Sequence, residues 1–210
     1  MAQSGTVLPE DKAKELLQQY DIPTTTFAVV DSVDAAMELD IDFPLVAKVC
    51  SSDIVHKSDV GGIRLNLRGR EELRSAVAEL LERFDMPVLV EHMEPPGVEM
   101  IAGLMHDPSF GLSIMTGMGG VYTELYNDVA FRLVPITRRD ADAMLDELVA
   151  SRLFEGFRGM HLDRNALIDL LISLSTLGSD HPSLRQMDVN PVLVYEDGLT
   201  VVDASVIMGD

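Results

Sequence analysis

The chain has few of the features that mark secreted or membrane proteins. Its 210 residues include one cysteine, Cys50, so no disulfide framework can form and a reducing compartment is expected. No apolar run approaches the length that spans a bilayer, and the N-terminus lacks the apolar core of a signal peptide. We therefore expect a soluble, cytoplasmic protein that has no membrane partner.

Positive charge is also scarce. The chain has 16 Lys and Arg residues against 35 Asp and Glu residues, which gives a formal net charge of −19. Because binding to a phosphate backbone needs a surplus of basic residues, this balance argues against nucleic acid as a partner. Two of the few lysines, Lys48 and Lys57, fall in one short stretch, which is where we expect an anionic ligand.

The stretch 43–63 is the most informative part of the sequence. Residues 45–49 are apolar on both faces apart from Lys48, the pattern of a fully buried strand. A buried ammonium group is costly unless a negative group meets it, and the strand itself contains none. The partner is then either a distant Glu or Asp or a ligand such as a nucleotide phosphate, and the pattern leaves both interpretations open.

His56 lies in the loop that follows, shortly before Gly61 and Gly62. Glycines let backbone N–H groups approach a phosphate closely. A histidine in such a loop can act as acid, base or nucleophile, and as a nucleophile it would carry a phosphoryl group. A lone loop histidine is more often structural or solvated, but the neighbouring Lys48 and double glycine favour the functional interpretation.

A second group of polar residues, Asp188, Asn190 and Asp203, lies near the C-terminus. A hairpin turn at residues 197–198 would bring Asn190 close to Asp203. Carboxylate and amide oxygens, completed by phosphate and water, are the ligands that Mg²⁺ prefers. The alternative is a turn-forming Asn-Pro and an exposed acid.

A third group is the glycine-rich run 116–120, followed by Glu124. Such a run is weak evidence for phosphate binding and is equally consistent with a tight connection between strands. Glu99 lies in an otherwise apolar strand, where a ribose hydroxyl or a second charged group would satisfy its carboxylate.

Periodicity predicts an α/β protein of two lobes with Pro95-Pro96-Gly97 as the hinge, hence lobes 1–93 and 94–210. Thr137 is expected to cap one helix. The expected helices cover residues 9–20, 32–39, 71–84, 138–148 and 163–177, and the expected strands cover 24–30, 45–49, 63–67, 87–93, 98–106, 110–115, 130–134, 187–195 and 199–206.

Several ordered motifs resemble the β subunit of ADP-forming acyl-CoA (acetate–CoA) synthetases, an ATP-grasp branch related to succinyl-CoA synthetase β. The resemblance covers nearly the whole chain. The motifs are Val-Ala-Lys48-Val, Asp-Ile-Val-His56-Lys-Ser-Asp-Val-Gly-Gly62, Pro-Pro-Gly-Val-Glu99, Asp107-Pro-Ser-Phe110-Gly, Gly-Met-Gly-Gly120-Val-Tyr-Thr-Glu124, Asp128-Val-Ala-Phe-Arg132-Leu, Asp188-Val-Asn-Pro191 and Val-Asp203-Ala.

The resemblance implies an ATP-grasp fold whose two lobes clamp a magnesium nucleotide. It implies that Lys48 contacts the phosphates of ATP or ADP and that Glu99 faces the ribose. His56 would take a phosphoryl group from a partner subunit and pass it to ADP, with Glu124 orienting its imidazole. The remaining implied contacts are the adenine-lining segment Glu91, His92 and Met93, the phosphate-loop glycines Gly61 and Gly62, and the Mg²⁺ ligands Asn190 and Asp203 with Asp188 as support.

The implied reaction is acyl-CoA + ADP + phosphate to carboxylate + CoA + ATP. No Gly-x-Gly-x-x-Gly follows a strand and opens a helix, so CoA binding is expected on a separate α subunit. The resemblance implies that the two kinds of subunit form a heterotetramer. Two alternatives remain: a regulatory module that senses nucleotide without turnover, and, more weakly, a metal-dependent hydrolase that uses Asp188 and Asp203. The hydrolase leaves Lys48 and the histidine loop unexplained.

Overall fold

The computed structural model of the chain describes residues 5–52, 57–120 and 128–209. It divides into two compact units, which are described separately below. Unit 1 comprises Met1–Leu8, Lys14–Thr24 and Pro96–Asp210, and unit 2 comprises Pro9–Ala13 and Thr25–Pro95. The chain thus passes between units next to the expected hinge. Residues 14–24, expected in the N-terminal lobe, group with the C-terminal part of the chain.

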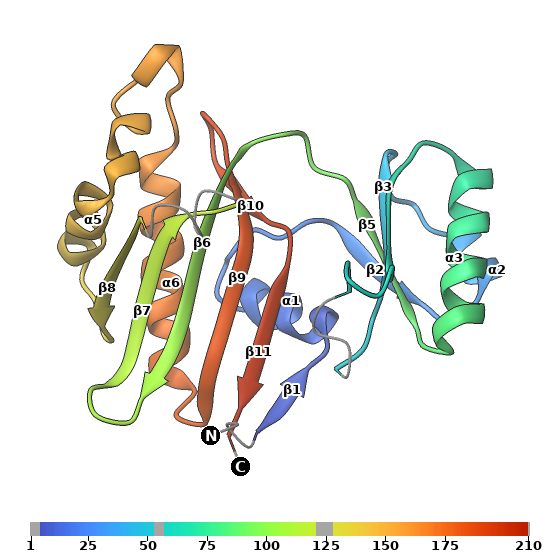
Figure 1. Cartoon of the computed structure of the whole chain (residues 1–210), viewed down its shortest axis with the longest axis horizontal. Helices are drawn as coiled ribbons and strands as arrows, with labels where there is room; N and C mark the ends of the chain where they lie inside the picture. The colour runs from blue at the N-terminus through green and yellow to red at the C-terminus, as the bar shows by residue number, and fades with distance from the viewer. Residues whose placement is uncertain (1–4, 53–56, 121–127, 210) are drawn as a thin grey trace. The chain divides into compact units, whose positions relative to one another are not determined.

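Unit 2 is a four-stranded antiparallel sheet in the order β2-β5-β3-β4 (Figure 1). Its strands are β2 (Phe27–Val30), β3 (Leu45–Val49), β4 (Ile63–Leu67) and β5 (Val88–His92), and its helices are α2 (Val33–Met37) and α3 (Arg70–Phe84). The side chains of Leu45 and Ala47 join a buried apolar cluster with residues of α2 and α3. Because side chains alternate along a strand, Val46 and Lys48 point to the opposite face of β3.

Unit 1 is built on a larger antiparallel sheet in the order β1-β11-β9-β6-β7-β8, with β10 paired to β9. The long strands are β6 (Val98–Asp107), β7 (Gly111–Met118) and β9 (Leu184–Val194). The shorter strands are β1 (Thr6–Leu8), β8 (Val129–Leu133), β10 (Leu199–Val201) and β11 (Ala204–Met208).

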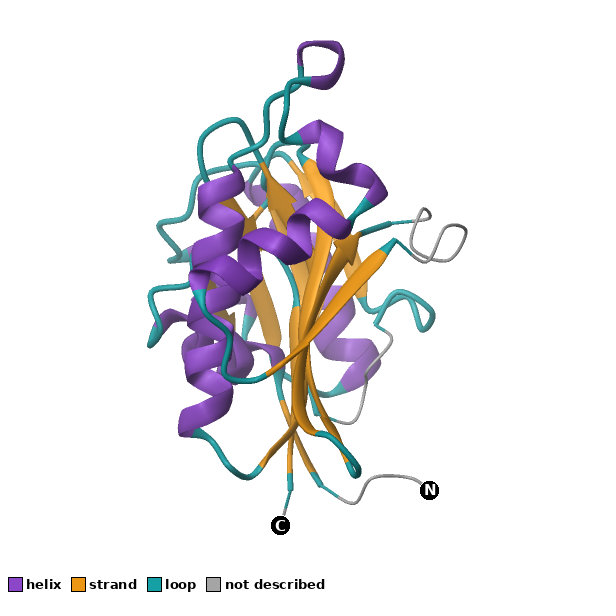
Figure 2. Cartoon of the chain, turned by 90° about the vertical axis from the view of Figure 1, so that its left-hand side faces the viewer, coloured by secondary structure: helices purple, strands orange, loops and turns teal. Residues whose placement is uncertain are grey.

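The helices of unit 1 cover one face of this sheet. Helix α6 (Arg164–Asp180) packs against β6 and β7, and α5 (Arg138–Glu147) packs against β8 (Figures 1 and 2). Two 3-10 helices, η1 (Val149–Leu153) and η2 (Phe157–Gly159), connect them. On β9 the apolar Met187 and Val189 are buried, whereas Asp188 and Asn190 are exposed on the other face. Asp188 and Asn190, two of the candidate metal ligands, therefore lie on the face that α5 and α6 leave open.

Most of the expected elements are confirmed. Ser32 caps α2, and Thr137 and Asp140 form a full capping box at the start of α5. The expected last strand, 199–206, is instead two strands, β10 and β11, with Asp203 between them. The three-residue strand β1 and the two 3-10 helices were not predicted, because such short segments carry no clear periodicity.

Helix α1 (Glu10–Gln18) has two acidic residues, Glu10 and Asp11, in its first turn, where they complement the helix dipole. Its first four residues belong to unit 2 and the rest to unit 1. Among the described residues, no helix is long and apolar enough to cross a membrane.

Candidate nucleotide-binding site

The buried lysine of β3 has protein partners. The ammonium nitrogen Nζ of Lys48 lies 2.5 Å from Oε1 of Glu91 and 2.8 Å from Oε1 of Glu10. The three side chains are at most 5% exposed. Of the two interpretations of Lys48, the structure therefore shows the one in which distant carboxylates of the chain meet its ammonium group.

Strand geometry places Glu91 beside Lys48. Strands β3 and β5 pair with Val46 opposite Glu91 and Lys48 opposite Leu89. Glu91 is therefore a diagonal neighbour of Lys48 on the same face of the sheet, within reach of long side chains. The hydroxyl of Thr25 donates a hydrogen bond of 2.6 Å to Oε2 of Glu91, which leaves Oε1 directed at the ammonium group.

A second lysine joins this cluster. Nζ of Lys57 lies 2.9 Å from Oε2 of Glu10, and the Lys57 side chain is 9% exposed. We call Glu10, Lys48, Lys57 and Glu91 the charge cluster; all four belong to unit 2. A buried ion pair contributes little net stability against its desolvation cost, so three of them in one cluster suggest a functional requirement for charge.

Lys57 begins the turn that holds the two glycines. The N–H groups of Gly61 and Gly62 donate to the carbonyls of Ser58 and Lys57 at 3.0 and 2.7 Å. Gly61 has φ +66°, which favours glycine. Guanidinium groups of Arg64 and Arg83 donate to the carbonyls of Gly61 and Val60. In this structure the glycines form a tight turn that is held by hydrogen bonds, and their contact with a phosphate stays a prediction.

His56 and Glu124, the expected phosphoryl carrier and its orienting carboxylate, lie outside the described residues. Their roles stay predictions from the sequence.

The segment expected to line the adenine is the end of β5. The N–H groups of His92 and Met93 donate to the carbonyls of Thr26 and Pro44 at 2.9 and 2.8 Å. The ring Nδ1 of His92 lies 2.8 Å from the carbonyl oxygen of Asp42. These contacts fix the position of the segment, and its role in lining the adenine stays a prediction.

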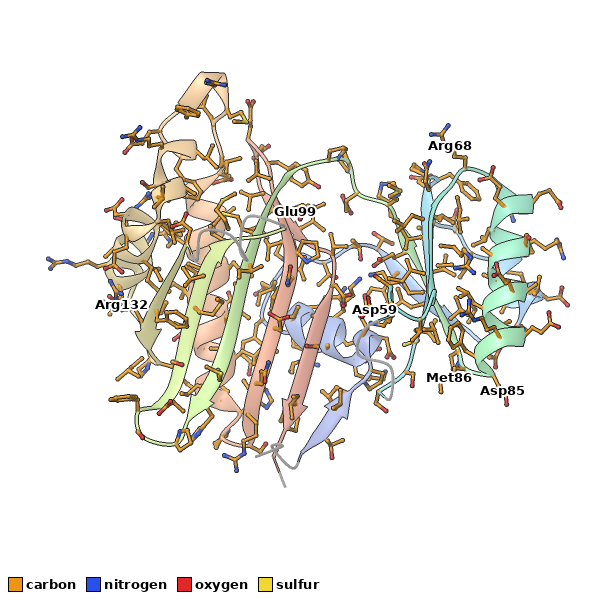
Figure 3. All side chains as sticks on the ribbon, viewed as in Figure 1. Asp59, Arg68, Asp85, Met86, Glu99 and Arg132 are labelled. Carbon is orange, nitrogen blue, oxygen red and sulfur yellow. The ribbon has the colours of Figure 1, made fainter. Side chains whose placement is uncertain are left out.

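In unit 1, Glu99, labelled in Figure 3, is exposed at the start of β6. The backbone of Gly119 donates to the Glu99 carbonyl at 2.8 Å, and a Cβ at Gly119 would lie 2.9 Å from the Glu99 backbone. The glycine run is therefore needed for close approach to β6. A pocket of about 620 Å³ is lined by Glu99 together with the glycine run and the apolar Val98, Met118, Leu153 and Met160.

Asn190 and Asp203 are brought together as the hairpin predicts. The Asn190 N–H donates to the carbonyl oxygen of Asp203 at 3.1 Å. Asp188 lies two residues before Asn190 on the same face of β9. Although the Asp188 side chain is exposed, partial desolvation by the surrounding chain raises the pKa of its carboxyl.

These three residues offer the oxygen donors that Mg²⁺ prefers. Within the part of the chain that the structure describes, no three His, Cys, Asp or Glu side chains gather as a complete protein cage. Mg²⁺ usually binds through one or two carboxylates and substrate phosphates, so this donor set fits it.

Two residues with a structural role were not singled out from the sequence. Glu10 contacts both lysines of the charge cluster. Asp128 is buried, and its carboxylate accepts hydrogen bonds from the N–H groups of Val149 and Ala150 at 2.7 and 2.9 Å, which caps η1. The cost of burying Lys48 predicted a negatively charged partner, either a carboxylate of the chain or a ligand, but gave no means of choosing among 35 acidic residues.

The buried lysine of one sheet and the Asn190–Asp203 pair of the other are among the features that the motif resemblance implies. The chain belongs to the ATP-grasp family, because the model of the ATP-grasp domain matches residues 1–208.

Two relatives show which members of the ATP-grasp family the chain resembles. The chain is 36% identical to the β subunit of ADP-forming acetate–CoA ligase I of Pyrococcus furiosus, over 96% of this chain and 91% of that subunit. It is 42% identical to the ADP-forming acetate–CoA ligase I of Archaeoglobus fulgidus, over 100% of this chain but only 32% of that protein. The chain therefore spans about a third of the longer relative. The family resemblance inferred from the motifs is confirmed.

Solved structures of a related synthetase are also similar to the chain. A dinucleotide-forming acetyl-coenzyme A synthetase of Ca. Korarchaeum cryptofilum, in complex with coenzyme A and Ca-AMPCP, matches with a TM-score of 0.91 and 41% identity. The match covers 97% of this chain and 93% of that one. The same synthetase with coenzyme A and Mg-AMPPCP, its phosphohistidine segment pointing towards the nucleotide binding site, matches with a TM-score of 0.86, 43% identity and the same coverage.

Proposed function

We propose that this chain is the nucleotide-binding β subunit of an ADP-forming acyl-CoA synthetase. The reaction is acyl-CoA + ADP + phosphate to carboxylate + CoA + ATP, in both directions. The observation that carries the proposal is the match to a separate β subunit over 96% of this chain and 91% of the relative. The buried charge cluster of unit 2 supports the proposal, because phosphoryl transfer depends on cations that are held in position to neutralise the phosphate charge.

The chemistry assigned to this chain is a two-step transfer through His56. An imidazole nitrogen of His56 attacks phosphorus, a P–N bond forms, and the bond from phosphorus to the donor on the partner subunit breaks. A β-phosphate oxygen of ADP then attacks the same phosphorus, the P–N bond breaks, and ATP forms. A covalent carrier replaces one long transfer by two short ones.

Other residues bind and orient. Lys48 neutralises charge on the nucleotide phosphates, Gly61 and Gly62 let the backbone approach them, and Glu99 accepts hydrogen bonds from the ribose. Asn190 and Asp203, with Asp188 beside them, would hold Mg²⁺. When bound, the ion supplies neutralisation of the phosphate charge.

Coenzyme A and the acyl group are assigned to a partner α subunit. The P. furiosus relative is named as a β subunit, and the A. fulgidus relative is about three times as long as the matched region. We propose that the two chains form a hetero-oligomer and that this chain alone does not complete the reaction.

Phosphate labelling tests the proposal. The purified chain, with and without an α subunit, is incubated with Mg²⁺ and γ-labelled ATP. We expect an acid-labile label that is lost in His56→Ala and kept in His106→Ala, a matched control on β6. Nucleotide binding without any label, even when the α subunit is present, would favour the nucleotide-sensing module instead.

A further inference from the structure

One carboxylate, that of Glu10, contacts two buried lysines. Its Oε1 lies 2.8 Å from Nζ of Lys48, and its Oε2 lies 2.9 Å from Nζ of Lys57. Each oxygen thus serves a different ammonium group, so the same carboxylate helps to fix the position of both.

The three side chains come from separate elements of unit 2. Glu10 is the first residue of α1, Lys48 lies within β3, and Lys57 begins the turn before β4. That turn is closed by the Gly62 N–H to the Lys57 carbonyl at 2.7 Å, and it is tied to β3 by the Val49 N–H to the Gly62 carbonyl at 2.9 Å. The backbone at both lysines is therefore fixed, and the Glu10 carboxylate joins their flexible ends, while Glu91 also contacts Lys48.

Two buried ammonium groups that meet at one carboxylate would repel each other without it. Lysine is a point charge on a flexible stem, so the position of its charge depends on its contacts. A nucleotide presents several anionic oxygens, and two adjacent cations can neutralise more of that charge than one.

We propose that Glu10 is a positioning residue that holds Lys48 and Lys57 together as a two-cation site for the phosphates of the nucleotide. This inference rests on the proposed nucleotide-binding function and assigns Lys57 as a second phosphate-binding residue beside Lys48. Glu10 acts through the lysines rather than on the nucleotide.

The direction in which MgATP affinity changes distinguishes a positioning role of Glu10 from a simple effect of its negative charge. Glu10→Gln keeps the shape of the side chain but removes a negative charge, so charge alone predicts tighter binding of an anion. Positioning predicts weaker binding of MgATP, by about tenfold, the size of one contact to a charged group. Calorimetric titration with MgATP and with adenosine gives both affinities, and only the affinity for MgATP should fall.

Glu15→Gln is the matched control, because it makes the same chemical change at an exposed position of α1. It should leave both affinities unchanged. The melting temperature of each variant is measured first, so that every titration is made on folded protein.

A double-mutant cycle tests whether Glu10 acts through Lys57. Lys57→Met should also weaken MgATP about tenfold, and E10Q/K57M should be no weaker than the weaker single variant. The double variant removes the Glu10–Lys57 pair as a unit, so it should melt closer to wild type than E10Q does while its MgATP affinity stays low. If E10Q does not fold, Lys57→Met and the double variant still carry the test.

The inference is overturned if E10Q binds MgATP as tightly as wild type or more tightly. It is also overturned if the losses of MgATP affinity in E10Q and K57M multiply in the double variant, or if E10Q weakens adenosine as much as MgATP. A wild-type chain that binds no MgATP would overturn the proposed function and this inference together. Wild-type binding with an unaffected E10Q overturns this inference alone.

Discussion

Lys48 and Glu91 form a diagonal ion pair across two central strands, with 2.5 Å between Nζ and Oε1 and both side chains almost fully buried. A lysine and a glutamate in the interior of a sheet would ordinarily be replaced by apolar residues that pack as well, because desolvation opposes the attraction. Their presence on the face opposite the apolar core of unit 2 indicates that this face is built around charge.

Removing Lys48 should damage both folding and binding. Lys48→Met leaves the buried carboxylates of Glu91 and Glu10 without this partner, and breaking a buried pair costs about 3–5 kcal/mol. We expect a loss of that size in urea unfolding at pH 7. MgATP binding should also become too weak to measure by calorimetry.

Lys12→Met is the control for this variant. The Lys12 side chain is 54% exposed, and its Nζ makes a longer ion pair of 3.6 Å with an Asp11 carboxylate oxygen. An exposed pair of this kind is worth about 0–1 kcal/mol. If Lys48→Met were as stable as Lys12→Met, the charge cluster would not contribute to the fold in the way the contacts indicate.

The metal site can be tested through its Mg²⁺ dependence. Asp203→Asn removes a carboxylate charge but keeps the backbone carbonyl that accepts from Asn190. We expect the Mg²⁺ concentration for half-maximal ATP binding to rise at least about tenfold, the effect of losing roughly 1.4 kcal/mol. Asn190→Ala should act in the same direction.

Asp197→Asn, in the exposed turn between β9 and β10, serves as the control and should leave the Mg²⁺ dependence unchanged. An Asp203→Asn chain with wild-type Mg²⁺ dependence would remove Asp203 from the metal site. The proposed nucleotide contacts of unit 2 would then have to be tested independently of Asp203.

Local signals predicted much of the fold. The apolar run around Lys48 gave β3, and the Asp197-Gly198 turn brought Asn190 to Asp203. Each of these features depends on residues near in sequence, whose spacing fixes their geometry.

Long-range pairings could not be read in this way. Strand β1 exists because Thr6 pairs with Met208 at the other end of the chain. Glu10 meets Lys48 because the first turn of α1 and strand β3 both belong to unit 2, although the two residues are 38 positions apart. No local pattern distinguishes Glu10 from the many acidic residues that start helices for electrostatic reasons alone.

The helix α5 gives a stability prediction that is independent of function. Thr137 accepts from the Asp140 N–H, and the Asp140 carboxylate accepts from the Thr137 N–H. The Thr137 hydroxyl also donates to this carboxylate, and this bond, followed by the one from the Thr137 N–H, lowers the pKa of Asp140. Thr137→Ala should cost about 1 kcal/mol in urea unfolding, the usual effect of losing an N-cap. Thr137→Ser keeps the cap and should lie within a few tenths of a kcal/mol of wild type; equal losses in both variants would contradict the role of the cap.

Cys50 should be unreactive while the chain is folded. Burial raises the pKa of its thiol to about 11, and the thiol donates to the Asp11 carboxylate at 3.3 Å, whose negative charge acts in the same direction. At pH 8 the folded chain should react with iodoacetamide far more slowly than the chain in urea, because the thiolate is the nucleophile. Equal rates in the two states would show that the thiol is neither buried nor protonated as the contacts require.

The same shift predicts how stability depends on pH. The folded pKa lies above the unfolded one, so the contribution of Cys50 is fully present at neutral pH and is lost as the pH rises toward about 11. In that range the unfolded chain loses its thiol proton first and becomes relatively more stable. Wild type should therefore lose more unfolding free energy than Cys50→Ala between pH 8 and pH 10.5, measured in urea, because only wild type has this thiol to ionise. Parallel losses in the two chains would assign the alkaline destabilisation to other groups.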